Sequence, residues 1–140
     1  MNKQPIVTVE ELSSEEADWL YRELVRYNRS RLRRSDHSTL TVSLRDDKHK
    51  LIGGLVGEAY WEWLYVGTLW VGENWRGQGY GAKLLAAAEA EARARSCRHA
   101  YLDTFSFQNL KFYQNRGYVI FGELENFPPG QIRYFLRKEL

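Results

Sequence analysis

Apolar and polar residues alternate along the chain with two different periods, and the clearest change of period lies near its centre. Residues 64–71 are mostly β-branched, aromatic and apolar, which is typical of a buried strand. Beyond a glycine-rich turn, Leu84, Leu85, Ala88 and Ala92 recur close to helical spacing between charged residues. The pattern therefore predicts a strand, a glycine-rich turn and a helix that runs to residue 94.

Further elements are predicted on both sides of this central unit. Strand-like patterns cover residues 5–9, 40–44, 51–60, 99–104, 118–122 and 131–136. A helix capped by Ser13 or Ser14 carries an apolar stripe made of Trp19, Leu20, Leu24 and Tyr27. Residues 28–38 are expected to form a loop or a short second helix, and residues 108–116 form a helix that stops at Gly117.

The connections between these strands predict one mixed sheet. The polar turn at 46–48 joins two strands as an antiparallel hairpin. The strand at 99–104 returns through a helix, so it should lie parallel to residues 64–71. The expected fold class is α/β in loose usage and α+β in the stricter sense. A central mixed, mostly antiparallel sheet is flanked by helices in a single domain over residues 1–140.

Composition narrows the classes of function. A net charge of +2 gives no general reason to expect nucleic acid, and the single cysteine, Cys97, excludes an internal disulfide. With no signal peptide and no apolar run long enough to span a membrane, we expect a cytoplasmic protein. The three histidines are scattered, so no metal site is predicted. Aromatic residues make up 14% of the chain and suit either an aromatic core or an apolar pocket.

The glycine-rich turn is the strongest candidate for a ligand site. Its glycines, Gly77, Gly79 and Gly81, let the backbone bend sharply and approach a ligand closely. The helix that opens after them leaves N–H groups unpaired, which favours an anion such as phosphate. A kinase-type P-loop is excluded because no Ser or Thr follows Lys83. The G-x-G-x-G spacing also differs from the dinucleotide fingerprint. A turn with no ligand is the alternative.

The six residues Arg76-Gly77-Gln78-Gly79-Tyr80-Gly81 fit the pattern Arg/Gln-x-x-Gly-x-Gly/Ala. This pattern resembles the pyrophosphate loop of the GNAT superfamily of acetyl-CoA-dependent N-acetyltransferases. Downstream, Asn109 and Tyr113 are spaced to share one side of a helix, and Gly117-Tyr118 follows. These pieces occur in the order found in that family, and the resemblance spans roughly residues 51–140.

The resemblance implies a role for each matching residue toward acetyl-CoA as co-substrate. The backbone edge of Leu69, Trp70 and Val71 would bind the pantetheine arm where two central strands splay apart. The amides of Arg76, Gly77, Gln78, Gly79, Tyr80 and Gly81 would hold the pyrophosphate. Asn109 would contact the pantetheine, Phe112 would pack near it, and Tyr113 would protonate the departing CoA thiolate. A core aromatic residue is the alternative reading of Tyr113.

The general base is less well defined. A carboxylate near the central strands, or a chain of waters, often deprotonates the amine in this family. Glu58, Glu62 and Glu73 are candidates, and we name Glu62 as a catalytic residue on that basis. Tyr65 stands where some family members carry an acid, and this departure weakens the case for a direct carboxylate base.

We therefore predict transfer of an acetyl group from acetyl-CoA to a primary amine of a small molecule by direct attack. Two alternatives are a catalytically silent acyl-CoA sensor and an enzyme that acetylates a peptide or protein amine. Binding of nucleic acid through Arg29, Arg31, Arg33 and Arg34 is a further alternative, against which the nearly neutral charge counts. A solvated helix end is the plainer explanation of that cluster. The C-terminal strands could also pair two subunits as a homodimer.

Overall fold

The computed structural model describes residues 3–32 and 37–140, and the chain divides into two units, 1–35 and 36–140. The first unit contains helix α1 (Ser14–Leu32). Ser13 Oγ accepts a hydrogen bond of 3.1 Å from the Glu16 amide, and the Glu16 carboxylate accepts one of 3.1 Å from the Ser13 amide. These two bonds form a reciprocal helix cap and lower the pKa of Glu16. The predicted cap at Ser13 is confirmed.

Two predictions for this first unit are wrong. Residues 5–9 form no strand, and Ile6, Val7 and Val9 are almost fully exposed. An alternating pattern makes a strand only where a neighbouring strand accepts its hydrogen bonds, and the described residues provide none for this segment. Helix α1 also continues past residue 28 to Leu32, so Arg29 and Arg31 lie in its last turn. Arg33 and Arg34, the rest of the predicted basic cluster, lie outside the described residues.

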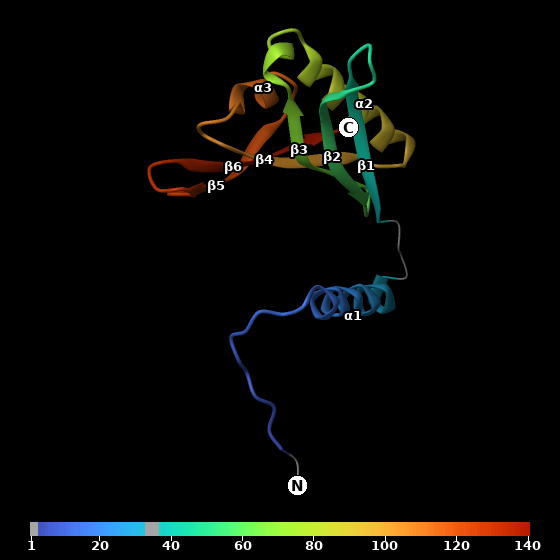
Figure 1. Ribbon diagram of the computed structural model, residues 1–140, viewed down its shortest axis with the longest axis vertical. Helices are drawn as coiled ribbons and strands as arrows, with labels where there is room; N and C mark the ends of the chain where they lie inside the picture. Colours follow the sequence, from blue (N-terminus) through green and yellow to red (C-terminus); the bar gives the residue numbers. More distant parts are fainter. Residues whose placement is uncertain (1–2, 33–36) are drawn as a thin grey trace. The chain divides into compact units, whose positions relative to one another are not determined.

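The second unit is a six-stranded sheet with strand order β1-β2-β3-β4-β6-β5 (Figure 1). The strands are β1 (Ser38–Arg45), β2 (Leu51–Tyr60), β3 (Trp63–Val71), β4 (His99–Phe105), β5 (Val119–Glu125) and β6 (Ile132–Glu139). Only β3 and β4 pair in parallel among these strands. This mixed, mostly antiparallel sheet confirms the predicted fold class and the parallel pair.

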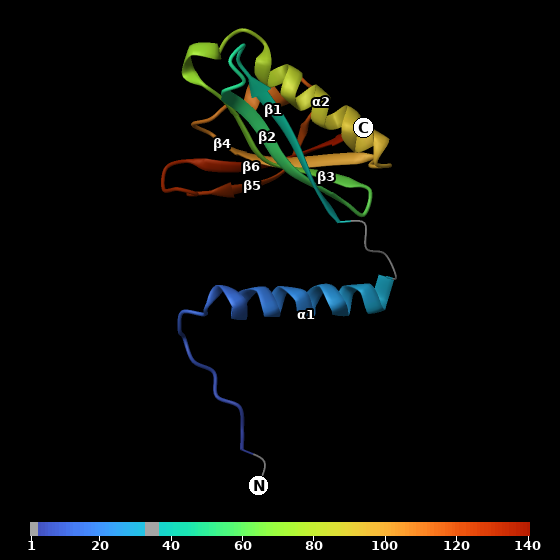
Figure 2. The same ribbon diagram turned by 45° about the vertical axis from the view of Figure 1, so that its right-hand side comes forward.

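Helix α2 (Tyr80–Ala94) covers one face of this sheet (Figure 2). Its residues Leu84, Leu85, Ala88 and Ala92 are buried, as their spacing predicted. Leu85, Ala88 and Ala92 pack against every second residue of the strands, among them Leu55, Leu64, Ala100 and Leu102. The apolar face of the helix and the inward-facing residues of the strands thus form one apolar core.

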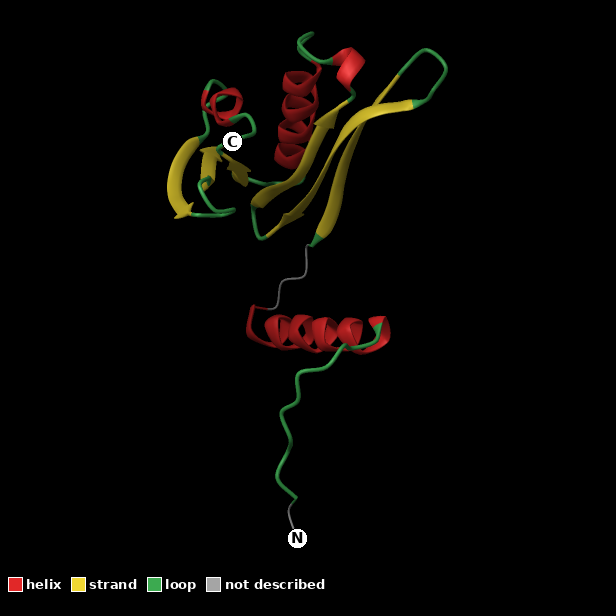
Figure 3. Ribbon diagram, turned by 60° about the vertical axis from the view of Figure 1, so that its left-hand side comes forward, coloured by secondary structure: helices red, strands yellow, loops and turns green. Residues whose placement is uncertain are grey.

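Strands β3 and β4 separate part of the way along their length. Their ladder runs from Trp63 opposite His99 to Val66 opposite Leu102, and then ends. On the other side of β3, the register with β2 slips by one residue, which leaves Gly67 without a partner. A bulge of this kind bends and twists the strand that contains it. Figure 3 shows the two halves of the sheet diverging beside α2.

The short helices of the second unit lie in the connections. A single 3-10 turn, η1 (Glu73–Trp75), follows β3, and helix α3 (Leu110–Gln114) follows β4. Helix α3 is shorter than the predicted 108–116. Asn109, just before it, has non-helical backbone angles, and the turn that follows Gln114 ends at Gly117 with a φ of 92°. No helix in the described parts of the chain is long and apolar enough to cross a membrane.

A buried polar network joins α2 to the C-terminal strands. Glu89 on α2 is 6% exposed, and its carboxylate lies 2.7 Å from Lys138 Nζ. The hydroxyl of Tyr118 donates a bond of 3.1 Å to the same carboxylate oxygen. Burial raises the pKa of Tyr118, and the charge of Glu89 raises it further, so this hydroxyl remains a donor. Tyr118 is buried and lies just before β5, so the predicted strand 118–122 begins one residue too early.

Because this network is largely buried, removing one of its two charges should lower the stability of the fold markedly. Lys138→Met should lower the free energy of unfolding by about 2 kcal/mol, because it leaves a buried carboxylate without its counter-ion. The double variant Glu89→Gln with Lys138→Met should recover most of that loss, because no buried charge remains and Tyr118 keeps an acceptor. Urea unfolding of the three proteins measures this, and equal stability of the single and double variants would contradict the prediction.

Candidate functional site

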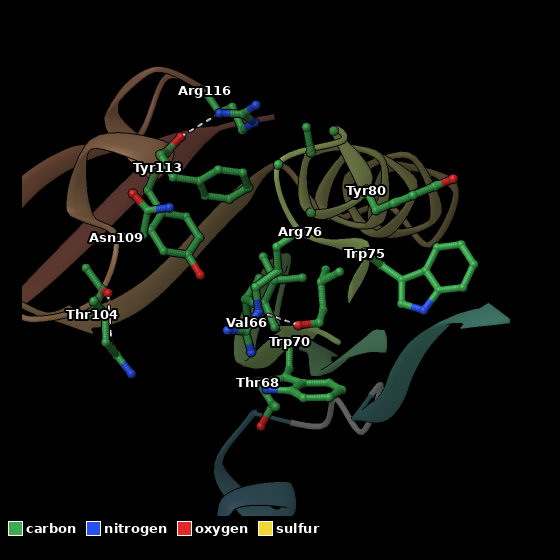
Figure 4. Close-up of a pocket in the computed structure, with 18 of the residues that line it drawn as sticks. Val66, Thr68, Trp70, Trp75, Arg76, Tyr80, Thr104, Asn109, Tyr113 and Arg116 are labelled. Carbon is green, nitrogen blue, oxygen red and sulfur yellow. Dashed lines mark hydrogen bonds between the residues drawn. The ribbon is translucent and has the colours of Figure 1, made fainter. Parts of the chain in front are cut away.

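A cleft of about 810 Å³ opens where β3 and β4 separate. One side is formed by Val66–Val71 of β3 together with the glycine-rich turn and the first residues of α2. The other side is formed by the end of β4 and by α3. Figure 4 shows the two sides facing each other across open space, with Trp75 and Tyr80 on one and Thr104 and Tyr113 on the other.

The glycine-rich turn presents free backbone donors to this cleft. Gly77 and Gly79 have φ values of 73° and 85°, in the left-handed region that favours glycine. Gly79 is the N-cap of α2, no side chain caps the helix there, and its first turn holds no acidic residue. The first amides of α2 therefore keep their unpaired N–H groups and the positive end of the helix dipole. This arrangement suits an anion.

Two arginines add positive charge on opposite sides of the cleft. Arg76 donates from Nε to the carbonyl oxygen of Val71 at 2.8 Å, which fastens the turn to the end of β3. Arg116 lies with its guanidinium 4.0 Å from the centre of the Phe112 ring and donates to the Phe112 carbonyl at 2.9 Å. Both cations are held in place by neighbouring groups, so the cleft is positive at its rim.

Tyr113 projects its hydroxyl into the space between the two sides (Figure 4). Its ring packs edge-on against Phe112 and Tyr118, with ring centres 5.0 and 6.0 Å away. Burial raises the pKa of Tyr113, and the negative charge of Asp103 raises it further. The hydroxyl therefore stays protonated at neutral pH and can donate a proton or a hydrogen bond.

The structure brings most of the predicted site residues together. Those that line the cleft are Leu69, Trp70, Val71, Arg76, Gly77, Gly79, Tyr80, Gly81, Asn109, Phe112 and Tyr113. Asn109 lies just before α3, and its side chain caps no helix amide. Gln78 does not line the cleft, and its side chain instead donates to the Asn74 carbonyl at 3.3 Å, which braces the turn.

The three glutamates considered as the base do not line the cleft. Glu62 lies in the turn between β2 and β3, at the opposite end of β3 from the glycine-rich turn. Its carbonyl accepts hydrogen bonds from the amides of Arg98 and His99, so Glu62 lies beside the segment that leads into β4. Glu58 lies 3.3 Å from His37, and Glu73 is in η1. Glu62 therefore lies outside the cleft, and its role as the base stays a prediction. Its nearness in sequence to the central strand did not show at which end of that strand the cleft would form.

Sequence reasoning missed several lining residues, namely Trp75, Asp103, Thr104, Gln108 and Arg116. Asp103 is the one carboxylate among the described residues that line the cleft. An acidic residue inside the strand His99–Phe105, which has no other carboxylate, was the signal that could have revealed it. Thr104 is buried and donates to the Gln108 side chain at 3.2 Å, which orders the start of the β4–α3 connection.

A strand pair that opens onto an uncapped helix N-terminus, with a protonated tyrosine opposite, is the arrangement expected of an acyl-CoA-dependent transferase. The chain belongs to the Acetyltransferase (GNAT) family, whose model matches residues 6–118. It is an acyltransferase enzyme of the acetyltransferase type. In the described residues, no group of His, Cys, Asp and Glu side chains is placed to hold a metal ion.

Three relatives support this assignment. The chain is 44% identical over 115 residues to an acetyltransferase of Agrobacterium fabrum, over 82% of this chain and 84% of the relative. It is 42% identical over 95 residues to the blasticidin-S acetyltransferase of Streptomyces morookaense, over 67% and 70% of the two chains. A crystal structure from Agrobacterium tumefaciens, assigned as an acetyltransferase, has 38% identity and a TM-score of 0.90 over 98% of this chain and 100% of that one.

The close approach of Phe112 to Gly81 limits the size of the side chain that position 81 can carry. A Cβ added there would lie 3.4 Å from the Phe112 ring. Gly81→Ala should therefore be tolerated, whereas Gly81→Val should lower the free energy of unfolding by about 1–3 kcal/mol through overpacking. Thermal unfolding measures the difference. Phe112→Leu added to Gly81→Val should restore stability, and a valine variant as stable as the parent would show that this contact is loose.

Proposed function

We propose that this enzyme transfers the acetyl group of acetyl-CoA to a primary amine of a small molecule, by direct attack of the amine nitrogen. The observation that carries the proposal is one cleft in which an unpaired strand edge, an uncapped helix N-terminus and Tyr113 meet. Family membership supports acetyl-CoA as the donor. The name of the blasticidin-S relative supports a small amine as the acceptor.

The residues of the cleft fit the parts of acetyl-CoA in order. The amides of residues 76–81 suit the pyrophosphate, and the positive rim made by Arg76 and Arg116 suits its charge. Beyond Val66, the edge of β3 that faces β4 has no strand partner, so its backbone groups suit the amides of the pantetheine arm. Leu69, Trp70, Val71, Asn109 and Phe112 line this path.

Tyr113 suits the role of proton donor to the leaving group. Attack by the amine breaks the carbon–sulfur bond, and negative charge develops on sulfur as it departs. A hydroxyl with a raised pKa remains protonated until that charge appears, and then stabilises or protonates it. Starting from the ammonium form, the nitrogen loses two protons overall, of which one ends on the CoA thiol. A neighbouring group must take the other.

Because Gly79 is the N-cap of the helix whose amides would hold the pyrophosphate, we expect Gly79→Ala to weaken acetyl-CoA binding specifically. At one hundred times its dissociation constant, acetyl-CoA should add about 2.7 kcal/mol to the stability of the parent. Gly79→Ala places a methyl group where nothing lies within 4 Å and strains a φ of 85°, so the dissociation constant should rise at least tenfold.

The matched control for that experiment is Gly130→Ala in the β5–β6 loop. Gly130 has a φ of 81° and equally open surroundings, but it does not line the cleft. Both variants should lose about 1 kcal/mol of stability through backbone strain. Only Gly79→Ala should lose the thermal shift with acetyl-CoA. No shift in the parent at millimolar acetyl-CoA would overturn the proposed donor.

The proposed proton donor is tested with Tyr113→Phe. Turnover should fall by about 10²–10⁴-fold, because the thiolate then leaves without a proton. The stabilisation by acetyl-CoA should be retained, because the hydroxyl is not required to hold the pyrophosphate. Steady-state release of free CoA thiol measures turnover with an amine that the parent accepts. A variant with parental turnover and pH profile would remove Tyr113 from the mechanism, and binding without transfer to any amine would indicate a sensor.

A further inference from the structure

Asp103 stands where the cleft opens through the sheet. It is the first residue of β4 after the last parallel pair, Val66 with Leu102. Its neighbours Leu102 and Thr104 are buried on the side of α2. Because side chains alternate along a strand, Asp103 is directed toward the opposite face of the sheet. It nevertheless lines the same cleft as Tyr113.

Arg133 on β6 fixes the position of this carboxylate. Its Nε and Nη2 atoms both lie 2.8 Å from Oδ1 of Asp103. The guanidinium is in turn held among aromatic rings, 5.4 Å from the centre of Phe105 and 5.0 Å from that of Phe127. Both contacts of Arg133 end on Oδ1 of Asp103. The side chain of Asp103 is 15% exposed, so it is mostly shielded from water.

The ionisable groups around Asp103 come from three further elements. Tyr65 on β3 has its pKa raised by burial and then by the charge of Asp103, to which its hydroxyl hydrogen-bonds. The pKa of Tyr113 on α3 is likewise raised by burial and then by the charge of Asp103. Glu58 on β2 lies opposite Tyr65 in the ladder. The cation that pairs with Asp103 is Arg133.

Two aromatic stacks flank the carboxylate. Tyr65 and Tyr101 stack with ring centres 4.9 Å apart on the β3 side. Phe105 stacks with Phe107 at 5.3 Å and with Phe127 at 5.7 Å on the β6 side. The residues Phe107 and Phe127 are 60% and 43% exposed, so this stack is open to a ligand. A carboxylate between flat apolar walls suits a cation attached to a flat group.

We propose that Asp103 binds the ammonium group of the acceptor and takes its proton, and that the two stacks select an amine joined to an unsaturated ring. The proposal rests on the proposed function and names the acceptor class of that same site. The ammonium gives one proton to the carboxylate of Asp103, which becomes a carboxylic acid. The neutral nitrogen bonds to the carbonyl carbon and the carbon–sulfur bond breaks. Tyr113 protonates the thiolate and regains a proton from the nitrogen, and Asp103 returns its proton to water.

The experiment compares the parent, Asp103→Asn and Glu123→Gln with benzylamine and cyclohexylmethylamine as acceptors. Glu123 is an exposed carboxylate on β5, outside the cleft, and serves as the matched control. The parent should prefer benzylamine by at least fivefold in kcat/KM. Asp103→Asn should lose at least 100-fold at pH 7, and its rate should keep rising with pH as the free amine forms. Glu123→Gln should behave as the parent.

Folding is checked in the same proteins by the thermal shift with acetyl-CoA. If Asp103→Asn is unstable because Arg133 loses its counter-ion, the double variant Asp103→Asn with Arg133→Gln removes both charges and should show the same kinetic loss. A parent that binds acetyl-CoA but acetylates neither amine overturns the proposed acceptor class. A parent that acetylates them equally overturns the role of the stacks. Unchanged kinetics and pH profile in folded Asp103→Asn overturn the role of the carboxylate and leave the acetyltransferase function standing.

Discussion

The end of hydrogen bonding between β3 and β4 is the constraint on which the rest of the site depends. Backbone groups inside a sheet are normally paired, and an unpaired edge in the middle of one is costly unless something else satisfies it. Here β3 stays joined to β2 while β4 stays joined to β6, so neither strand can close the gap alone. The bulge at Gly67 turns the divergence into a fixed property of the backbone. A ligand that supplies amide groups is the natural partner of such an edge.

The two sides of the cleft are held by different parts of the core. Helix α2 is fixed by its apolar face and by the pairing of Glu89 with Lys138 on β6. Helix α3 is short, and it depends on Phe112 and on the buried Tyr118 that follows it. The two sides meet where Phe112 approaches Gly81. The width of the cleft is therefore determined by packed elements, which is the kind of support that a precise reaction geometry requires.

The sequence predicted the parts of the site that are local and missed those that depend on the arrangement of the sheet. The glycine-rich turn and helix α2 could be read directly, because their signals lie within one short segment. Glu62 and Asp103 could not be ranked, because their distance from the cleft depends on the direction of β3 and on which strand lies beside β4. Residues 5–9 show the same limit, since their alternation carries no information on whether a partner strand is present.

The order of the strands has a consequence for how the site is assembled. Strand β6 follows β5 in the chain but lies between β4 and β5 in the sheet. The segment around Asp103 therefore remains a bare strand edge until residues 132–139 have been synthesised and inserted. Contacts between segments so far apart in sequence form late and slowly. In the order of synthesis, helix α2 precedes the strand that supplies Arg133, so the ion pair of Asp103 with Arg133 forms only when the last strand of the sheet is in place.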